Sequence, residues 1–553
     1  MGRRAALAAS LLLSMGGFAC SKRKSDAAPS ARPVPPVAPA PPAGLMAELV
    51  VADASAFWKV SRELIGLRGA TLPKRFEPVV AVVLGLPGSV ANFLAADRPL
   101  FGVWLLADGE PSLVLALKLR SAAELVLELT RSGGGYRAER DAASGVTRLV
   151  GTAEGRALGV REDWLLVGDT APALSAAGAY VTDVLAARPL PIEASRVTVP
   201  RAALAGPFTE WLRSRLDQLQ KALAKSAEAA TRAAGRRADF ADPTAVLGLL
   251  ERASAWLLAL VADGEALRAT VLPTPFRLEL SLELEPRAGG PAARFAEALL
   301  LGPIDPLLTL PSGAACALLI QGADATAAPD AAHPSDVLGS LFGARLREGD
   351  AKRMRAVLER FARGFRSRGA YALYADHSLV ARQAVRDAVE AERALEEGFA
   401  LLDVPALSAP LAALVGPLAP RASTLRVGAS NAAVHRVALG APNGPNHGLE
   451  AFFRVDARDA CVALGRAARA RFAALSEPTA NAVLGANPEL RAAAERRGPV
   501  AYAAFLDLYA LTPGRPAVLP VLASLSRRDG RPRLALELSD VAVALFAGLV
   551  GGP

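Results

Sequence analysis

Residues 276–285 read FRLELSLELE, an alternation of apolar and charged or polar side chains over the whole stretch. A period of two is typical of a β-strand with one face on a core and the other in water. The apolar positions are Phe276, Leu278, Leu280, Leu282 and Leu284. This pattern predicts an antiparallel sheet that has one buried face and one wet face.

Hairpin signals occur elsewhere along the chain. Residues 156–160 and 164–167 are apolar runs on either side of a short polar turn, and residues 434–439 and 449–455 flank an Asn-Gly pair, which favours a tight turn between antiparallel strands. Residues 533–538 alternate in the same way. We therefore expect several antiparallel pairs.

A second pattern joins an apolar strand to an amphipathic helix through one polar residue. Ser121 followed by Glu124 has the form of a capping box. We expect a helix N-cap at each of the five junction residues, which are Asp53, Ser121, Asp169, Asp376 and Asp456. After Asp376 a helix is expected from Ser378, and after Asp456 a helix is expected up to Phe472. A ligand site shared by these positions is the alternative, but capping accounts for all of them.

The two patterns together predict an α+β fold, with curved antiparallel sheets, helices packed on one face and two or three related modules. Loop-like composition at residues 185–193 and 322–336 sets the boundaries. We expect modules at 45–190, at 191–325, which includes an Ala-rich helix over 211–237, and at 326–553.

The start of the chain has the pattern of a bacterial lipoprotein leader. Arg3 and Arg4 precede an apolar run over residues 5–18, which is too short to span a bilayer. Small residues then precede Cys20. We expect residues 1–19 to be a signal peptide cleaved between Ala19 and Cys20, and Cys20 to carry the lipid. An ordinary cleaved leader with an incidental cysteine is the alternative.

Residues 20–44 continue with a short charged segment and then the Pro/Ala-rich run AAPSARPVPPVAPAPPAG. Such a run favours extended polyproline II and acts as a spacer. Ser21, rather than Asp, follows the lipidated position. These features predict a protein of the cell envelope, lipid-anchored in the outer membrane and facing the periplasm.

The leader with Cys20, the tether, the strand–Asp–helix units and the segment Leu310-Pro311-Ser312-Gly313-Ala314 before a strand resemble bacterial lipoproteins of uncharacterised function with a repeated α+β body. The resemblance implies location and shape. It supplies no catalytic residue.

Composition excludes several classes of protein. Of 553 residues, 52% are hydrophobic, which is too many for a disordered chain. The 63 basic residues are interleaved with 54 acidic ones and form no aromatic-rich basic stripe, so we expect no nucleic-acid partner. The partners expected are the membrane, through the anchor, and an envelope protein or a hydrophobic ligand.

No catalytic constellation is evident, and we predict neither an enzyme nor a metal nor a cofactor. The four histidines, His333, His377, His435 and His447, have no metal-binding spacing. The adjacent residues Asp376, His377 and Ser378 cannot adopt triad geometry. Cys316 in a strand and Cys461 in a helix are expected to be buried thiols, with a disulfide between them as the alternative. The functional hypotheses are a binding or structural module and, as the alternative, a carrier of lipid or another hydrophobe in a cavity between sheet and helices.

Overall fold

A computed structural model describes residues 39–543, apart from 65–71, 108, 132–134, 143, 152–155, 235–242, 323–345, 406, 409–417, 419, 427–432, 441–446, 508–519 and 540–541. The chain divides into two compact units, which differ in their boundaries from the three modules expected from loop composition. Unit 1 comprises Met1–Arg213, Leu260–Ala292 and Ala535–Pro553, and unit 2 comprises Ser214–Ala259 and Ala293–Leu534.

The strands of unit 1 are all paired antiparallel, in the spatial order β4-β5-β6-β7-β3-β2-β1-β8-β9-β10. Their bounds are β1 (Leu45–Val51), β2 (Leu100–Ala107), β3 (Glu110–Lys118), β4 (Tyr136–Asp141), β5 (Val146–Gly151), β6 (Ala157–Arg161), β7 (Trp164–Gly168), β8 (Ser195–Pro200), β9 (Gly264–Thr274) and β10 (Arg277–Pro286). The predicted antiparallel sheet and the hairpin at residues 156–167 are confirmed.

Unit 2 repeats this order strand for strand: β14-β15-β16-β17-β13-β12-β11-β18-β19, with β20 paired to β19. The bounds are β11 (Ala314–Ile320), β12 (Phe365–Tyr374), β13 (Leu379–Val385), β14 (Arg421–Arg426), β15 (Ala433–Ala438), β16 (Glu450–Val455), β17 (Asp459–Gly465), β18 (Tyr502–Asp507) and β19 (Pro520–Arg528). Strand β20 (Arg531–Ser539) belongs to unit 2 up to Leu534 and to unit 1 from Ala535. If β11 is matched to β1 and each later strand to its counterpart, the two pairing schemes are the same.

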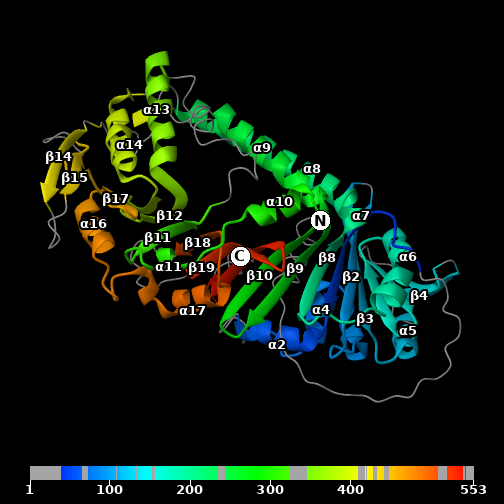
Figure 1. Cartoon of the computed structure of the whole chain (residues 1–553). Helices are drawn as coiled ribbons and strands as arrows, with labels where there is room; N and C mark the ends of the chain where they lie inside the picture. The colour runs from blue at the N-terminus through cyan, green and yellow to red at the C-terminus, as the bar shows by residue number, and fades with distance from the viewer. Residues whose placement is uncertain are drawn as a thin grey trace. The chain divides into compact units, whose positions relative to one another are not determined.

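Helices also occupy matching places in the strand order of the two units. In each unit a helical segment follows the first, third and seventh strands (Figure 1). The helical segments of the described residues are α2 (Ala54–Leu64), α4 (Phe76–Val83), η1 (Gly88–Phe93), α5 (Ala122–Thr130), α6 (Ala171–Ala179), η2 (Tyr180–Leu185), α7 (Arg201–Leu204), α8 (Pro207–Ala234), α9 (Pro243–Ala262), α10 (Pro291–Ala298), α11 (Asp305–Leu308), α13 (Glu348–Gly364), α14 (Ala388–Ala400), η6 (Leu401–Asp403), α16 (Ala468–Ser476), η7 (Leu484–Ala486) and α17 (Pro488–Arg497). The helix expected over 211–237 is confirmed as α8 up to Ala234, and residues 235–237 lie outside the described part of the chain.

Helices cover both faces of each sheet, so the expectation of helices on one face was wrong. In unit 1, one core joins α2, α4 and α5 to the sheet, and a second core on the opposite face joins α6 and η2 to it. All seven residues of β1 are buried. Strand β1 has no wet face, because a strand in the middle of a sheet covered on both sides buries every side chain, here including that of Glu48.

Unit 2 is layered in the same way. Phe452 belongs to the core beneath α16 and α17, and its neighbour Phe453 belongs to the core beneath α14. Adjacent residues of a strand point to opposite faces, so α14 and α16 cover opposite faces of the unit 2 sheet. Figure 1 shows α13 and α14 side by side in this unit.

The alternating stretch that predicted the sheet is strand β10, but its faces are less regular than the sequence indicates. Leu278 and Leu284 are buried as expected. Leu282 is 38% exposed, and Phe276 lies in the turn before the strand with 79% of its surface exposed. Ser281 is buried and its hydroxyl bonds that of Thr270 on β9, so a polar pair replaces an apolar contact within the sheet.

Candidate functional site

The residues expected to carry the anchor, Ala19 and Cys20, lie outside the described part of the chain, as does His333. Their roles stay predictions. Among the described helices, none is both long and apolar enough to cross a lipid bilayer.

The five junction residues prove to serve three different structures. Asp53 accepts a hydrogen bond from the backbone N–H of Ala56, and Ser121 accepts one from Glu124, so both are helix caps as predicted. Asp169 stands one residue before the cap of α6, which is Thr170, and instead accepts from the N–H of Leu113.

The helices expected after Asp376 and Asp456 were wrong, because both aspartates lie in turns between strands. Asp376 accepts from the backbone N–H of Ser378, and β13 follows. Asp456 accepts from the backbone N–H groups of Arg458 and Asp459, and β17 follows. An aspartate turn and a helix N-cap use the same chemistry, a carboxylate that accepts a nearby backbone N–H, so the residue type alone does not separate them.

Cys316 and Cys461 are both free thiols. Cys316 lies on β11 as expected but is only partly buried, so the expectation of a buried thiol was wrong for it. Cys461 is buried as expected, but it lies on β17 and not on a helix. Burial raises the pKa of the Cys461 thiol. A thiol with a raised pKa is less reactive, so Cys461 is a packing residue of the unit 2 core.

The most distinctive feature of unit 2 is an open hollow of about 600 Å³ that carries four arginines, which we call the arginine pocket. Its floor comes from β12, β13 and the turn before β17, and its rim from the segment around α11. The four are Arg366, Arg368, Arg382 and Arg458, and they share the pocket with the carboxylates of Asp305 and Asp459. The formal balance is four positive charges against two negative ones, a net of +2.

A bulge in β12 places two of these arginines. In the pairing of β12 with β13, Phe365 faces Val385 and Gly369 faces Gln383, so four residues along β12 match two along β13. Arg366 and Arg368 lie within this bulge, and both line the pocket. Bulges of this kind re-aim side chains at functional sites, and apolar periodicity does not reveal them.

The arginines of the pocket differ in how firmly they are held. Arg382 donates to Thr309 Oγ1 at 3.0 Å and to the Leu475 carbonyl at 2.6 Å, and Arg366 Nε donates to the Val385 carbonyl at 3.2 Å. Within the described residues, the guanidinium groups of Arg368 and Arg458 have neither a hydrogen-bond nor an ion-pair partner. Two fixed guanidiniums and two uncommitted ones therefore meet in one hollow.

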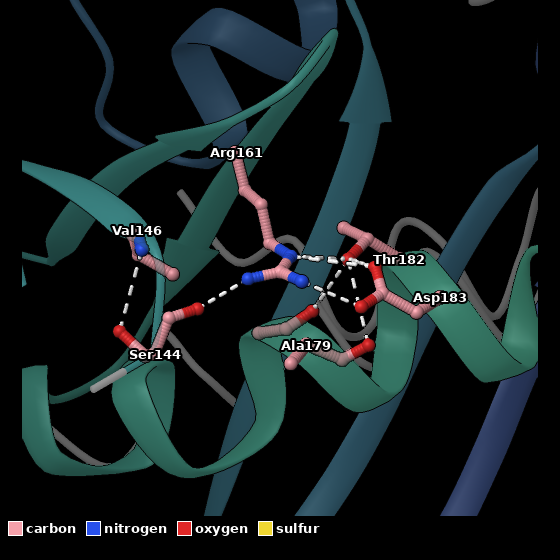
Figure 2. A network of polar contacts seen from close by, with 7 residues as sticks. Ser144, Val146, Arg161, Ala179, Thr182 and Asp183 are labelled. Carbon is pink, nitrogen blue, oxygen red and sulfur yellow. Dashed lines mark hydrogen bonds and ion pairs between the residues drawn. The ribbon is translucent and has the colours of Figure 1, made fainter. Parts of the chain in front are cut away.

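Unit 1 contains a polar network of a different kind, centred on Arg161 of β6 (Figure 2). Figure 2 shows its guanidinium between the carbonyl of Ser144 and the π-helical turn η2, where Thr182 and Asp183 accept its hydrogen bonds. The Nε to Thr182 Oγ1 distance is 3.0 Å. Because the donors at both ends of the guanidinium are engaged, this network fastens η2 to β6 and offers few free groups to a ligand.

A third group joins Glu392 and Glu396 of α14 to His435 of β15. Their ligand-type atoms all lie within 4.8 Å of one another. His435 has no evident partner in the sequence, because the glutamates are 43 and 39 residues away and only the packing of α14 on the sheet brings them together. The i,i+4 spacing of the two glutamates was the available signal.

Comparison of the chain with protein-family models, with curated proteins and with solved structures gives no match.

Proposed function

We propose that this chain is a lipid-anchored, non-enzymatic cell-envelope protein whose unit 2 binds an oxyanion, a phosphate or carboxylate group of its ligand, in the arginine pocket. The anchoring part of the proposal is supported by the leader, Cys20 and the Pro/Ala-rich tether. The binding part is carried by one observation, the convergence of Arg366, Arg368 and Arg382 with Arg458 in one hollow.

The chemistry of the pocket favours an oxyanion over other ligands. A guanidinium presents a planar fork of N–H donors that matches the two oxygens of a carboxylate or phosphate. Arg368 and Arg458 are exposed and uncommitted within the described residues, so they can turn to such a group without breaking a bond. Asp305 and Asp459 would repel a second negative charge, which favours a ligand with one compact anionic group.

The hydrophobe-carrier alternative is favoured by a second hollow of unit 2. It measures about 840 Å³ and is lined mainly by apolar residues, among them Leu301, Ile304 and Val483. It shares Asp305 and Thr309 with the arginine pocket. A ligand with an anionic head and an apolar tail would therefore contact both hollows, and we propose such an amphiphile as the second candidate ligand.

Calorimetric titration of the full chain with inorganic phosphate and with dodecyl phosphate tests both candidates. We expect saturable phosphate binding that weakens at high ionic strength. We expect the double variant Arg368→Gln/Arg458→Gln to bind at least about tenfold more weakly, because a hydrogen bond to a charged group contributes about 1.5 kcal/mol or more.

The matched control is Arg355→Gln/Arg469→Gln, which removes two exposed arginines of unit 2 outside the pocket. Equal losses in the two double variants would refute the pocket, since they would report net charge alone. Tighter binding of dodecyl phosphate than of inorganic phosphate supports the amphiphile, and equal affinities argue against it.

Metabolic labelling with a fatty-acid probe tests the anchor separately. We expect the full-length chain to be labelled, and Cys20→Ala to lose the label. Cys316→Ala is the matched control and should keep it. Label that persists in Cys20→Ala would overturn lipidation at this residue.

A further inference from the structure

A polar cluster on the surface of unit 2 brings together the carboxylates of Glu392 and Glu396 and the imidazole of His435. None of these residues lines the arginine pocket. Glu392 and Glu396 lie one helical turn apart on α14, and His435 lies on β15 beneath them. The distance from His435 Nε2 to Glu392 Oε1 is 2.6 Å, and that from Nδ1 to Glu396 Oε1 is 3.3 Å.

The imidazole is held in place by aromatic packing. The ring of His435 stacks on that of Phe453 with centroids 4.6 Å apart and planes 9° apart. Phe453 in turn stacks on Phe399 of α14 at 5.6 Å. Since the same aromatic column fixes both the helix and the ring, the position of the histidine relative to the glutamates is set by the core and not by the polar contacts alone.

The three side chains of the cluster differ in their exposure to solvent. The side chain of His435 is 18% exposed, whereas those of Glu392 and Glu396 are 45% and 51% exposed. A rigid, half-buried imidazole below two solvent-facing carboxylates leaves one open side, from which an ion can enter and at which water can complete its coordination.

We propose that Glu392, Glu396 and His435 form a binding site for one divalent transition-metal ion, with Zn²⁺ the best-matched ion. One imidazole nitrogen and two carboxylate oxygens are a ligand set that Zn²⁺ accepts, with the fourth tetrahedral position left to water. Ligand atoms bound to one Zn²⁺ at about 2.0–2.2 Å are about 3.3–3.6 Å apart. Glu392 and Glu396 now contact different ring nitrogens, so one of the two must rotate toward the nitrogen that binds the metal, and both side chains are about half exposed.

The topological counterpart in unit 1 shows that the fold itself does not require these carboxylates. Helix α5 follows the third strand of unit 1 as α14 follows the third strand of unit 2. Counted from the N-caps Ser121 and Asp387, Val126 and Thr130 of α5 match Glu392 and Glu396 of α14. Because α5 folds without acidic side chains there, the pair on α14 is a feature particular to unit 2.

Titration of the full chain, purified without a histidine tag and freed of metal by chelator and gel filtration, tests the site. We expect Zn²⁺ to bind with a stoichiometry that falls by one in His435→Phe, a change that keeps an aromatic ring over Phe453. Glu392→Gln and Glu396→Gln should each weaken this site by at least about tenfold. His447→Gln, which removes an exposed histidine elsewhere, should change nothing.

The Gln variants keep the test decisive if His435→Phe unfolds, because both altered side chains are half exposed. A Co²⁺ titration gives a second readout, a visible absorption band that the wild type shows and the variants lack. Equal Zn²⁺ stoichiometry and affinity in the wild type and in all three site variants would overturn the proposal and leave the cluster as a set of polar contacts between α14 and β15.

Discussion

Replacing Tyr180 by Phe removes one hydroxyl from a buried charge network of unit 1. Tyr180 lies in η2, and its hydroxyl donates to the carboxylate of Glu48 on β1. Arg188 donates to the same carboxylate at 2.7 Å and to the tyrosine oxygen at 2.9 Å. Glu48 is only 6% exposed and Tyr180 only 3%, so the pair is shielded from water.

The size of the effect follows from the charge on the acceptor. Burial, and then the hydrogen bond to Glu48, raise the pKa of Tyr180 to about 12, so the hydroxyl is a donor at neutral pH. A hydrogen bond to a charged group contributes about 1.5–3 kcal/mol. Arg188 cannot compensate fully, because its side chain is 46% exposed and its attraction to Glu48 is screened by water. We expect Tyr180→Phe to destabilise unit 1 by about 2 kcal/mol.

Tryptophan fluorescence during denaturation of the full chain measures this loss. Four of the five tryptophans, Trp58, Trp104, Trp164 and Trp211, fall in unit 1, so the signal reports mainly that unit. A loss of about 2 kcal/mol lowers the melting temperature of a unit of this size by about 4–8 °C.

The matched control is Tyr136→Phe, which lies in the same unit. The Tyr136 hydroxyl has no hydrogen-bond partner among the described residues, so we expect a change below about 0.5 kcal/mol. Equal effects of Tyr180→Phe and Tyr136→Phe would refute the reasoning, since the loss would then owe nothing to the buried carboxylate.

Three further changes test other parts of the fold. Arg161→Lys should cost about 1–3 kcal/mol in the same assay, because an ammonium group cannot span the contacts drawn in Figure 2. Burial raises the pKa of Tyr374 from 10.0 to about 12. The stability that this shift contributes is present below pH 10 and is lost as the pH rises through about 12. The denaturation midpoint should therefore fall less between pH 8 and 11.5 in Tyr374→Phe than in the wild type. Gly465→Ala should destabilise unit 2 by about 2 kcal/mol or more in chemical denaturation, because a Cβ there would lie 2.7 Å from the Cα of Ser378 and φ is 134°. Gly88→Ala should be tolerated, because a Cβ at Gly88 would have no atom within 4 Å.

Local patterns predicted local structure well in this chain. The capping box at Ser121 and Glu124 formed the expected helix start, and the alternation at residues 276–285 formed β10. The prediction of which face of each strand is buried was less accurate. Whether Leu282 is buried depends on what lies over the strand, and a period of two states only that its neighbours point the other way.

These sequence patterns also could not predict the candidate sites, because each site joins residues from distant parts of the chain. The arginine pocket joins residues around 303–309 to residues 366–385 and 457–459, and it depends on a bulge that apolar periodicity does not mark. In a chain with 63 basic residues, no single arginine stands out in the sequence. Only strand pairing between β12, β13 and β17 shows which of them converge.

The matching strand orders of the two units provide a way to separate residues that the fold requires from residues that serve a particular role. At the helix after the third strand, Leu125 and Leu129 of α5 match Ala391 and Leu395 of α14, counted from the N-caps, and all four are buried. These positions must be apolar in both units because each helix packs on a sheet through them.

One residue further along each helix, the two units diverge. Val126 and Thr130 of α5 border an open hollow of about 790 Å³ beside β5, whereas Glu392 and Glu396 of α14 stand over His435. The buried positions of this helix are apolar in both units, whereas the next position differs between them. If that next position is not fixed by the fold, α5 should tolerate Val126→Glu/Thr130→Glu with a loss below about 2 kcal/mol, because Val126 is only partly buried against the core and the Thr130 hydroxyl donates to a carbonyl of its own helix. A loss above about 2 kcal/mol in tryptophan-detected denaturation would show that these positions are fixed by the fold, and that the two helices are not equivalent.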